Sequence, residues 1–234
     1  MFRADEIGAL AWRPDDAVER DGWLFRSAHG FTRRANSATP VATARMPIVD
    51  AVDWVADEAR SRGQIARFQL SDHLLHDAER RWLTEMGIGG IDSTLVMVAR
   101  QALDRFDPAV DVADRVDAPW HNRWHDVSGA SVAPQISAGF MAGLGGVKAA
   151  SVGPIDRPSC VGLGLETELG SYLCAIATDP SLRGRGMATR LVAHLMTIMP
   201  APFVLNVVPS NPAVRIYERL GFSAVHSYRY HELG

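Results

Sequence analysis

The segment from Ser171 to Leu195 constrains the fold most, because it predicts a strand, a loop and a helix in direct succession. Residues 172–178 are apolar or favour β-structure, and Asp179-Pro180 ends the run. Apolar side chains then recur at the three- and four-residue spacing of one helix face: Ala188, Leu191, Val192, Leu195, Met196 and Met199. The sequence therefore predicts a helix that begins at the glycines before Ala188.

The loop between this strand and this helix contains Arg183, Gly184, Arg185 and Gly186. The first amides of a helix have no partner within the helix, and that end carries a partial positive charge, so phosphate oxygens bind there. Glycine lets the backbone approach such a ligand, and the arginines add positive charge. A solvated structural loop also fits this composition, so the loop alone does not decide between the two interpretations.

A second motif follows at residues 211–222. Asn211 suits a helix cap, Pro212 suits the first helical position, and Gly221 suits the exit of a short helix. Positions 213, 216, 217 and 220 are apolar at helical spacing. Residues 203–208 before this helix and 223–230 after it are predicted strands.

The two motifs in this order resemble the GNAT superfamily of acyl-CoA-dependent N-acetyltransferases. The resemblance rests on Arg183-x-x-Gly186-x-Ala188 and on Asn211-x-Ala213-x-x-x-Tyr217-x-x-x-Gly221-Phe222. It covers about the last 70 residues strongly and residues 134–169 in outline. The resemblance implies an α/β (α+β) fold with a mixed twisted sheet flanked by helices. It also implies direct transfer of an acetyl group from acetyl-CoA to an amine.

The same resemblance assigns roles to individual residues. The pantetheine of acetyl-CoA is expected to pair with an exposed strand edge at Ile176, Ala177 and Thr178. Its pyrophosphate is expected on the amides of the loop and the first helical turn, which are Arg183, Gly184, Arg185, Gly186, Met187 and Ala188. Asn211 matches the family asparagine near the pantetheine. Tyr217 matches the tyrosine that protonates the departing sulfur, although helical spacing alone also fits a core aromatic.

The sequence does not identify the general base that would accept the proton of the amine. Some members of the family place a carboxylate on the strand that leads into the loop, where this chain has Tyr172 and Cys174. Glu166 and Glu168 lie slightly earlier and are candidates, and each also fits an exposed strand-end or turn carboxylate. Cys174 could suggest an acyl-cysteine route, but a buried small core residue in mid-strand is the preferred interpretation.

The first half of the chain repeats the order of the second half, which predicts two related units in tandem. Residues 78–87, AERRWLTEMG, echo residues 213–221, AVRIYERLG. Residues 44–47 replace the glycine-rich loop, so we expect residues 1–105 to form a degenerate GNAT-like domain and residues 106–234 the catalytic domain. Arg33 and Arg34 could reach an anionic group, and a solvated turn is the preferred interpretation.

Other elements follow from spacing and breakers. Helices are predicted at residues 47–62 and 73–86, and strands at 23–25, 65–70 and 94–100. Residues 104–119 are expected to form a linker that leads into a helix, and residues 139–165 a β-hairpin. Trp120, His121, Trp124 and His125 could share a helix face, and we expect packed tryptophans and partly exposed histidines rather than a metal site.

Composition narrows the function classes. The 234 residues carry a formal net charge of −3, which argues against bulk nucleic-acid binding. The two cysteines provide no disulfide framework, no spacing predicts a structural zinc site, and no segment predicts a signal peptide or a membrane span. We therefore expect a cytoplasmic protein, monomeric or homodimeric, that takes a small-molecule or peptide amine as acceptor. The alternative is a non-catalytic acyl-CoA-binding regulatory or interaction module.

Overall fold

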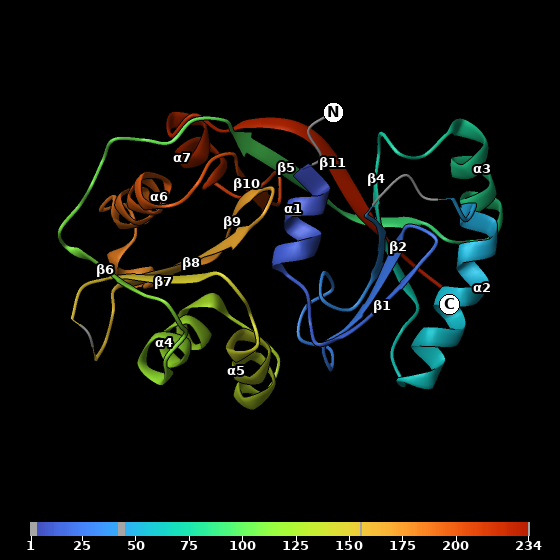
Figure 1. Cartoon of the computed structure of the whole chain (residues 1–234), viewed down its shortest axis with the longest axis horizontal. Helices are drawn as coiled ribbons and strands as arrows, with labels where there is room; N and C mark the ends of the chain where they lie inside the picture. Colours follow the sequence, from blue (N-terminus) through green and yellow to red (C-terminus); the bar gives the residue numbers. More distant parts are fainter. Residues whose placement is uncertain (1–3, 42–44, 155, 234) are drawn as a thin grey trace.

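The computed structural model describes residues 4–41, 45–154 and 156–233. Among these residues, eleven strands form one continuous twisted sheet in the spatial order β1-β2-β3-β4-β11-β5-β10-β9-β8-β7-β6 (Figure 1). The strands are β1 (Asp16–Arg20), β2 (Trp23–Ser27), β3 (Ala38–Pro40), β4 (Arg67–Ser71), β5 (Gly90–Ala99), β6 (Val110–Ala113), β7 (Val147–Val152), β8 (Cys160–Thr167), β9 (Gly170–Thr178), β10 (Phe203–Val207) and β11 (Ser223–Glu232). The helices are α1 (Ala4–Ala11), α2 (Ile48–Ser61), α3 (Asp77–Glu85), α4 (Ala118–Ser128), α5 (Pro134–Ala142), α6 (Met187–Ile198) and α7 (Val214–Arg219).

The element order of the first half recurs in the second half. β1-β2-β3-α2-β4-α3-β5 corresponds to β7-β8-β9-α6-β10-α7-β11, and in each series the third and fourth strands pair in parallel. The last strand of each series lies in the other half, because β11 pairs with β4 and β5 while β5 also pairs with β10. The predicted mixed sheet and its two related units are confirmed, and the domain boundary near residue 105 stays a prediction.

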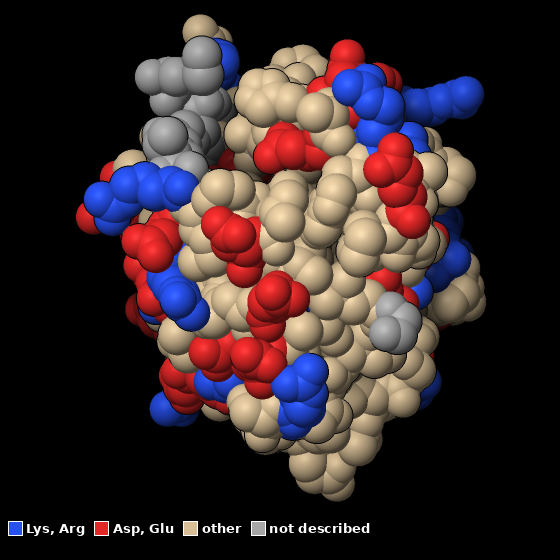
Figure 2. Space-filling model, turned by 90° about the vertical axis from the view of Figure 1, so that its right-hand side faces the viewer, with Lys and Arg blue, Asp and Glu red and all other residues tan. Residues whose placement is uncertain are grey.

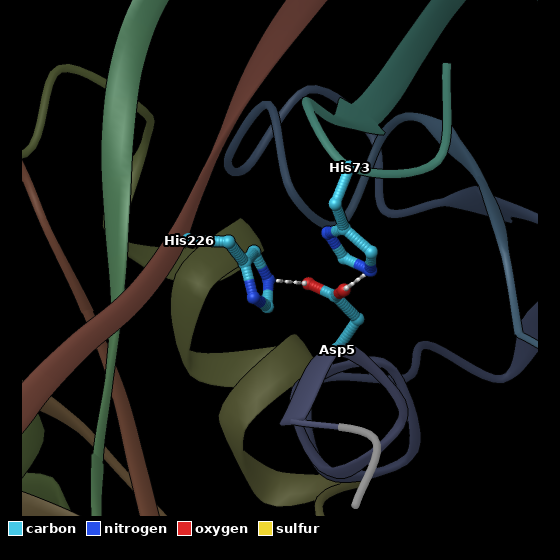
Figure 3. Close-up of side chains that lie close together, drawn as sticks. All are labelled: Asp5, His73 and His226. Carbon is cyan, nitrogen blue, oxygen red and sulfur yellow. Dashed lines mark hydrogen bonds and ion pairs between the residues drawn. The ribbon is translucent and has the colours of Figure 1, made fainter. Parts of the chain in front are cut away.

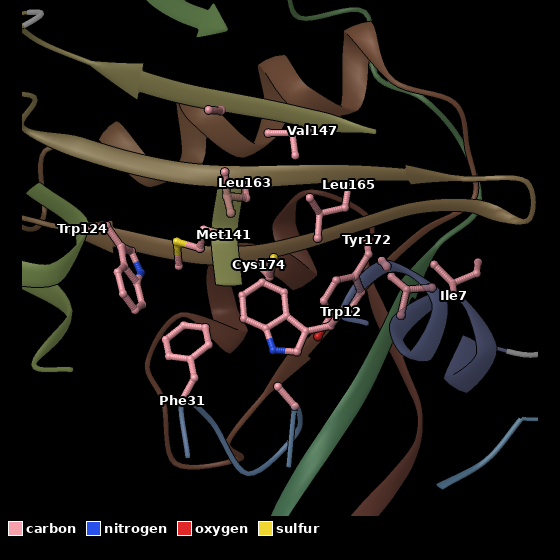
Figure 4. Close-up of a cluster of buried hydrophobic side chains, with 14 of the residues drawn as sticks. Ile7, Trp12, Phe31, Trp124, Met141, Val147, Leu163, Leu165, Tyr172 and Cys174 are labelled. Atoms are coloured by element: carbon pink, nitrogen blue, oxygen red, sulfur yellow. The ribbon is translucent and has the colours of Figure 1, made fainter. Parts of the chain in front are cut away.

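Helices cover both faces of the second half. Side chains alternate along β9, so Leu173 faces the core under α6 and α7, whereas Tyr172 and Cys174 face the opposite core under α1, α4 and α5. Figure 4 shows this second core, in which the rings of Trp12 and Phe31 are 5.9 Å apart between centroids. The N-terminal helix α1 therefore packs against β8, β9 and β10, strands of the other half. Helices α2 and α3 pack on a separate core over β2 and β4.

Several helix boundaries differ from the sequence predictions. The helix predicted from residue 73 begins at Asp77, because the preceding residues form a turn whose Asp72 amide donates to the Ser227 carbonyl of β11 at 2.9 Å. The helix predicted from Pro212 begins at Val214. The Asn211 side chain accepts a hydrogen bond from the Ala213 amide at 2.9 Å, so it shapes the turn before the helix rather than capping it.

Five helices and strands lie outside the sequence predictions, and two of them are the short strands β1 and β3 of the first half. Helix α1 has eight residues, which is too short for apolar spacing to predict a helix. Strand β6 lies in the predicted linker, where Val110 and Val112 alternate with Asp111 and Ala113 at an edge of the sheet. Helix α5 occupies residues 134–142, so the predicted hairpin begins only at Val147. The mixture of small and apolar side chains in this region does not distinguish a helix from a strand.

Charges on the face formed by α2 and α3 are of both signs. Figure 2 shows this face, the right-hand side of Figure 1, with acidic and basic side chains interspersed around uncharged residues. None of the helices in the described part of the chain is long and apolar enough to cross a membrane.

Candidate active site

The parallel strands β9 and β10 separate partway along their length. They pair only at Ser171, Tyr172 and Leu173, opposite 203–205. Beyond this point β9 contains one extra residue relative to β8, and Ala175 has a φ of +52°, which defines a β-bulge. The edge of β9 from Cys174 to Thr178 is therefore not paired with β10, and its polar groups on that side face a gap between the strands.

A groove of about 830 Å³ begins at this gap and continues over the start of α6. It brings together the predicted residues Ile176, Ala177, Thr178, Arg183, Gly184, Arg185, Gly186, Met187, Ala188, Asn211 and Tyr217. The sequence did not predict Val127 and Ser128 of α4 or Arg219 of α7, which also line it. The strand edge, the loop and the first turn of α6 thus form one continuous surface.

The loop before α6 requires glycine because of its backbone conformation. Gly184 and Gly186 have φ angles of +78° and +76°, where other residues are strained, and a Cβ at either position would meet nothing within 4 Å. The first helical bond runs from the Arg190 amide to the Gly186 carbonyl at 3.0 Å. The amides of residues 187–189 therefore have no partner within the helix, and the groove presents anion-binding donors.

An ion pair anchors the start of the loop. Arg123 of α4 pairs with Asp179, and its Nε donates to the Pro158 carbonyl at 2.7 Å. The Ser181 hydroxyl and amide, followed by Arg123, lower the pKa of Asp179 to about 2. This anchor links residues far apart in sequence and was not predicted; its one local signal is an Asp before Pro180 at the start of a short 3₁₀ helix (Pro180–Leu182).

Tyr217 lies in α7 with only 8% of its surface exposed, and it lines the groove. Burial, with a smaller effect of Cys160, raises the pKa of its phenol to about 12. The phenol is therefore protonated at neutral pH and is a competent proton donor. Its ring also packs 6.0 Å from that of Phe222 between centroids, so the core and site interpretations of this residue are compatible.

Glu166 and Glu168 do not line the groove. Glu166 pairs with Ser171 at the start of β9, six residues before Ala177, and Glu168 follows β8 in the turn. A strand advances about 3.3 Å per residue, so this separation is roughly 20 Å. The structure does not bring either carboxylate together with Tyr217.

Other predicted candidates are engaged in packing. Cys174 is buried, and burial raises the pKa of its thiol to about 12, which keeps it in the unreactive thiol form. His121 is buried with its Nε2 2.9 Å from the Ser137 hydroxyl, and His125 Nε2 lies 3.0 Å from the Val132 carbonyl. The expectation of a partly exposed His121 is therefore wrong, because α5 covers it.

On the opposite side of β9 lies Arg34, which is half-buried and whose Nε atom is buried. The guanidinium of Arg34 lies 5.7 Å from the ring centroid of Trp12 and 5.5 Å from that of Tyr172. Its partner in sequence, Arg33, pairs with Asp92 on the surface. The expectation of a solvated turn is correct for Arg33 and wrong for Arg34, because α1 places Trp12 over it. No sequence pattern signals this contact across 22 residues.

A second cavity of about 480 Å³ lies between the segment after α1 and α5. Arg13, Asp15, Asp16 and His29 line it together with Phe140. Gln135 and Ile136 of the first turn of α5 also line it, but Asp15 and Asp16 place carboxylates in the lining that oppose a bound anion. The groove at α6 is therefore the better anion-binding site of the two.

A family model described as "Probable histone acetyltransferase Rv0428c C-terminal" matches residues 3–231. Similar solved structures include a GCN5-related N-acetyltransferase from Kribbella flavida (12% identity, 98% of this chain and 93% of that chain, TM-score 0.70) and a GNAT-family structure from Novosphingobium aromaticivorans DSM 12444 (18%, 93% and 90%, TM-score 0.60). A tandem GNAT protein from the clavulanic acid biosynthesis pathway is also similar (11%, 98% and 87%, TM-score 0.59). At these identities the likeness shows the fold alone. No curated protein sequence matches the chain.

Proposed function

The chain belongs to this acetyltransferase family of the GNAT superfamily, and on that premise we propose that it transfers an acetyl group from acetyl-CoA directly to a primary amine. One observation carries the proposal: the unpaired edge of β9 and the amides at the start of α6 line the same groove. The acceptor is a small-molecule amine or an amine of a peptide. The description of the family makes a lysine side chain in a basic peptide the first acceptor to try.

The residues of the groove fit the chemistry of the donor. Backbone groups of Ile176, Ala177 and Thr178 would hold the pantetheine amides as an added strand, and the loop amides at residues 183–188 would hold the pyrophosphate. Arg185 and Arg219 line the groove and supply positive charge. Asn211 lines the groove near the turn that it shapes. Bound acetyl-CoA would supply an activated acyl carbon.

Tyr217 would donate a proton to the departing thiolate. Its pKa of about 12 keeps the phenol protonated at neutral pH, so the proton is available when the thioester bond breaks and the thiolate departs. Glu166 and Glu168 remain the sequence-based candidates for a base, but their place in β8 and the following turn favours neither. The proposal therefore routes the amine proton to water.

One observation favours the alternative of a non-catalytic acyl-CoA-binding module. Among the described residues that line the groove there is no Asp, Glu or His, so no side chain of the ordinary general-base types faces it. Measuring turnover decides between the two functions. A module that binds acetyl-CoA but acetylates neither small amines nor lysine peptides would be the alternative.

Calorimetric titration with acetyl-CoA tests the site itself. Gly186→Glu places a side chain at a φ of +76° and a negative charge among the phosphate-binding amides, so we expect the dissociation constant to rise more than about 100-fold. Gly63→Glu is the matched control, because Gly63 has a φ of +63° and equally open space after α2. Equal loss of affinity in both variants, or no binding by the native chain, would overturn the proposal.

A further inference from the structure

Three metal-ligand side chains meet at the junction of the two halves, away from the groove residues described above. Asp5 comes from the first turn of α1, His73 from the segment between β4 and α3, and His226 from β11 (Figure 3). One ligand atom from each lies within 4.8 Å of the others. His226 Nε2 is 2.9 Å from Asp5 Oδ1, and His73 Nε2 is 4.0 Å from Asp5 Oδ2.

The backbone around two of these residues is fixed. The Asp72 amide donates to the Ser227 carbonyl at 2.9 Å, and the Ser227 hydroxyl donates to the Asp72 carboxylate. These bonds hold the neighbours His73 and His226 side by side. A shift in the pairing of β11 with β5 between Ala224 and His226 inserts one residue just before His226. The two imidazoles therefore project from a scaffold that is set by main-chain pairing.

The donor set is that of a borderline transition metal. Two imidazoles and one carboxylate suit Zn²⁺ and its neighbours, whereas Mg²⁺ and Ca²⁺ prefer oxygen ligands. In tetrahedral zinc sites, bonds of about 2.0–2.1 Å separate ligand atoms by roughly 3.3 Å. The His226–Asp5 separation is already close to this value. His73 needs to move by about 1 Å, which its half-exposed side chain allows.

Charge also favours a cation at this position. Asp5 contributes a carboxylate, and Asp72 lies close enough to act electrostatically on His73. A hydrogen-bonded cluster without metal would need only the Asp5–His226 pair. The second imidazole, with a ring centroid 4.4 Å from that of His226, is not needed for that pair and supplies a third ligand for a cation.

We propose that Asp5, His73 and His226 bind one divalent transition-metal ion, with Zn²⁺ as the preferred ion and water at the fourth position. The ion would join residues that are far apart in the sequence. It would also fix the first turn of α1 against β11. Helix α1 lies directly over β9, because a Cβ at Gly8 would be 3.5 Å from the Tyr172 ring. The site is independent of the acetyl-CoA groove and stands whether or not the proposed transfer occurs.

Metal binding by the full, tag-free chain tests the proposal. After removal of metal with a chelator, titration with Zn²⁺ is followed by calorimetry and titration with Co²⁺ by visible absorption, which reports tetrahedral coordination. We expect one ion per chain, and a melting temperature that rises with Zn²⁺. We expect His73→Ala to weaken binding more than tenfold while the chain stays folded, because His73 is exposed. Asp5→Asn should abolish the Co²⁺ spectrum.

A control isolates the cluster from other histidines. His29→Asn removes an exposed imidazole at a φ of +48° that Asn tolerates, and it should leave the affinity for Zn²⁺ unchanged. Failure of the native chain to bind Zn²⁺ or Co²⁺ would overturn the proposal. So would binding that survives both His73→Ala and Asp5→Asn, or binding that is lost only when His125 is replaced. Acetyl-CoA titration of the same samples reports separately on the groove.

Discussion

The two halves of the sheet begin their central helices in opposite ways. In the second half, α6 follows Gly186 and leaves the amides of its first turn without partners in the helix. In the first half, α2 follows Pro47, which has no N–H. The Arg45 and Met46 amides before it donate to the Asp21 carbonyl at 3.0 and 3.5 Å. The first half has therefore used amides of the segment before its helix, where the second half has the open glycine loop.

The strands before these helices also differ, because the second half has the longer strand and leaves more of its edge unpaired. β9 is nine residues long and separates from β10 after three pairs, whereas β3 has three residues and pairs with β4 only at Ala38 and Phe68. Trp23 Nε1 also donates to the Met46 carbonyl at 3.0 Å and packs this end of α2. Two units with one topology thus differ in their capacity for a ligand, because that capacity resides in the loop and the strand edge rather than in the fold.

The largest expected difference between the halves is an effect on kcat. It concerns the aromatic residue in the last helix of each half, Tyr217 in α7 and Trp82 in α3. Tyr217→Phe removes the proposed proton donor, so we expect kcat to fall about 100-fold with little change in KM for acetyl-CoA. Trp82→Phe is the corresponding change in α3 and should leave kcat within about twofold. Steady-state kinetics with an accepted amine measures both. A Tyr217→Phe variant with native kcat would assign this residue to the core alone.

The arginine anchors provide the next comparison. Arg123→Ala removes the contacts with Asp179 and the Pro158 carbonyl, and we expect it to lower the free energy of unfolding by about 2 kcal/mol. Arg62→Ala in the first half removes contacts with Asp16 and Glu58 and should lower it by about 1 kcal/mol. Arg123→Ala should also weaken acetyl-CoA binding by about tenfold, because its partner Asp179 directly precedes the glycine loop before α6. Arg62→Ala should not change this affinity, because its partners lie in the first half. Denaturant unfolding and calorimetry measure the two quantities, and equal affinities would show that the anchor does not position the loop.

The sequence predicts those parts of the site that are continuous in the chain. The strand, the loop and the helix from residue 171 to 195 were located because periodicity, glycine and arginine lie within one segment. Asn211 and Tyr217 are predictable for the same reason, because their motif also lies within one short continuous segment, residues 211–222. Each of these residues lines the groove.

Features that depend on pairing across the sheet were not predictable. The exchange of β5 and β11 joins strands about 130 residues apart, and no local pattern specifies it. The contact of Arg34 with the Trp12 ring depends on the position of α1, and the meeting of Asp5, His73 and His226 depends on three segments. The positive φ of Ala175 also breaks the local rule that favours glycine, as functional sites often do.

That bulge gives a smaller stability effect. Ala175→Gly relieves an alanine held at a φ of +52°, so we expect the free energy of unfolding to rise by about 1 kcal/mol. Ala177→Gly, two residues later in ordinary strand conformation, should lower it by a similar amount. Urea unfolding of the two variants measures the difference. Destabilisation by both changes would mean that the bulge conformation carries no strain.

The smallest expected effect is a pH dependence that originates in the second half. Hydrogen bonds from Arg190 lower the pKa of Asp107 to about 2, and those from Ser181 do the same for Asp179. An unfolded Asp titrates near a pKa of about 3.9, so the folded chain holds fewer protons between these values. The stabilisation is complete above about pH 4 and is lost as the pH falls towards 2.

Asp179→Asn should flatten this loss when unfolding is measured from pH 5 to pH 2. Asp57→Asn in α2 is the control, because the Asp57–Arg60 ion pair is exposed and screened by solvent. If the two variants titrate alike, acid sensitivity is spread over the surface. If only Asp179→Asn flattens the dependence of the free energy of unfolding on pH, the charged Asp179 carboxylate stabilises the folded chain. The glycine loop that distinguishes the second half then begins at a residue on whose charge stability depends.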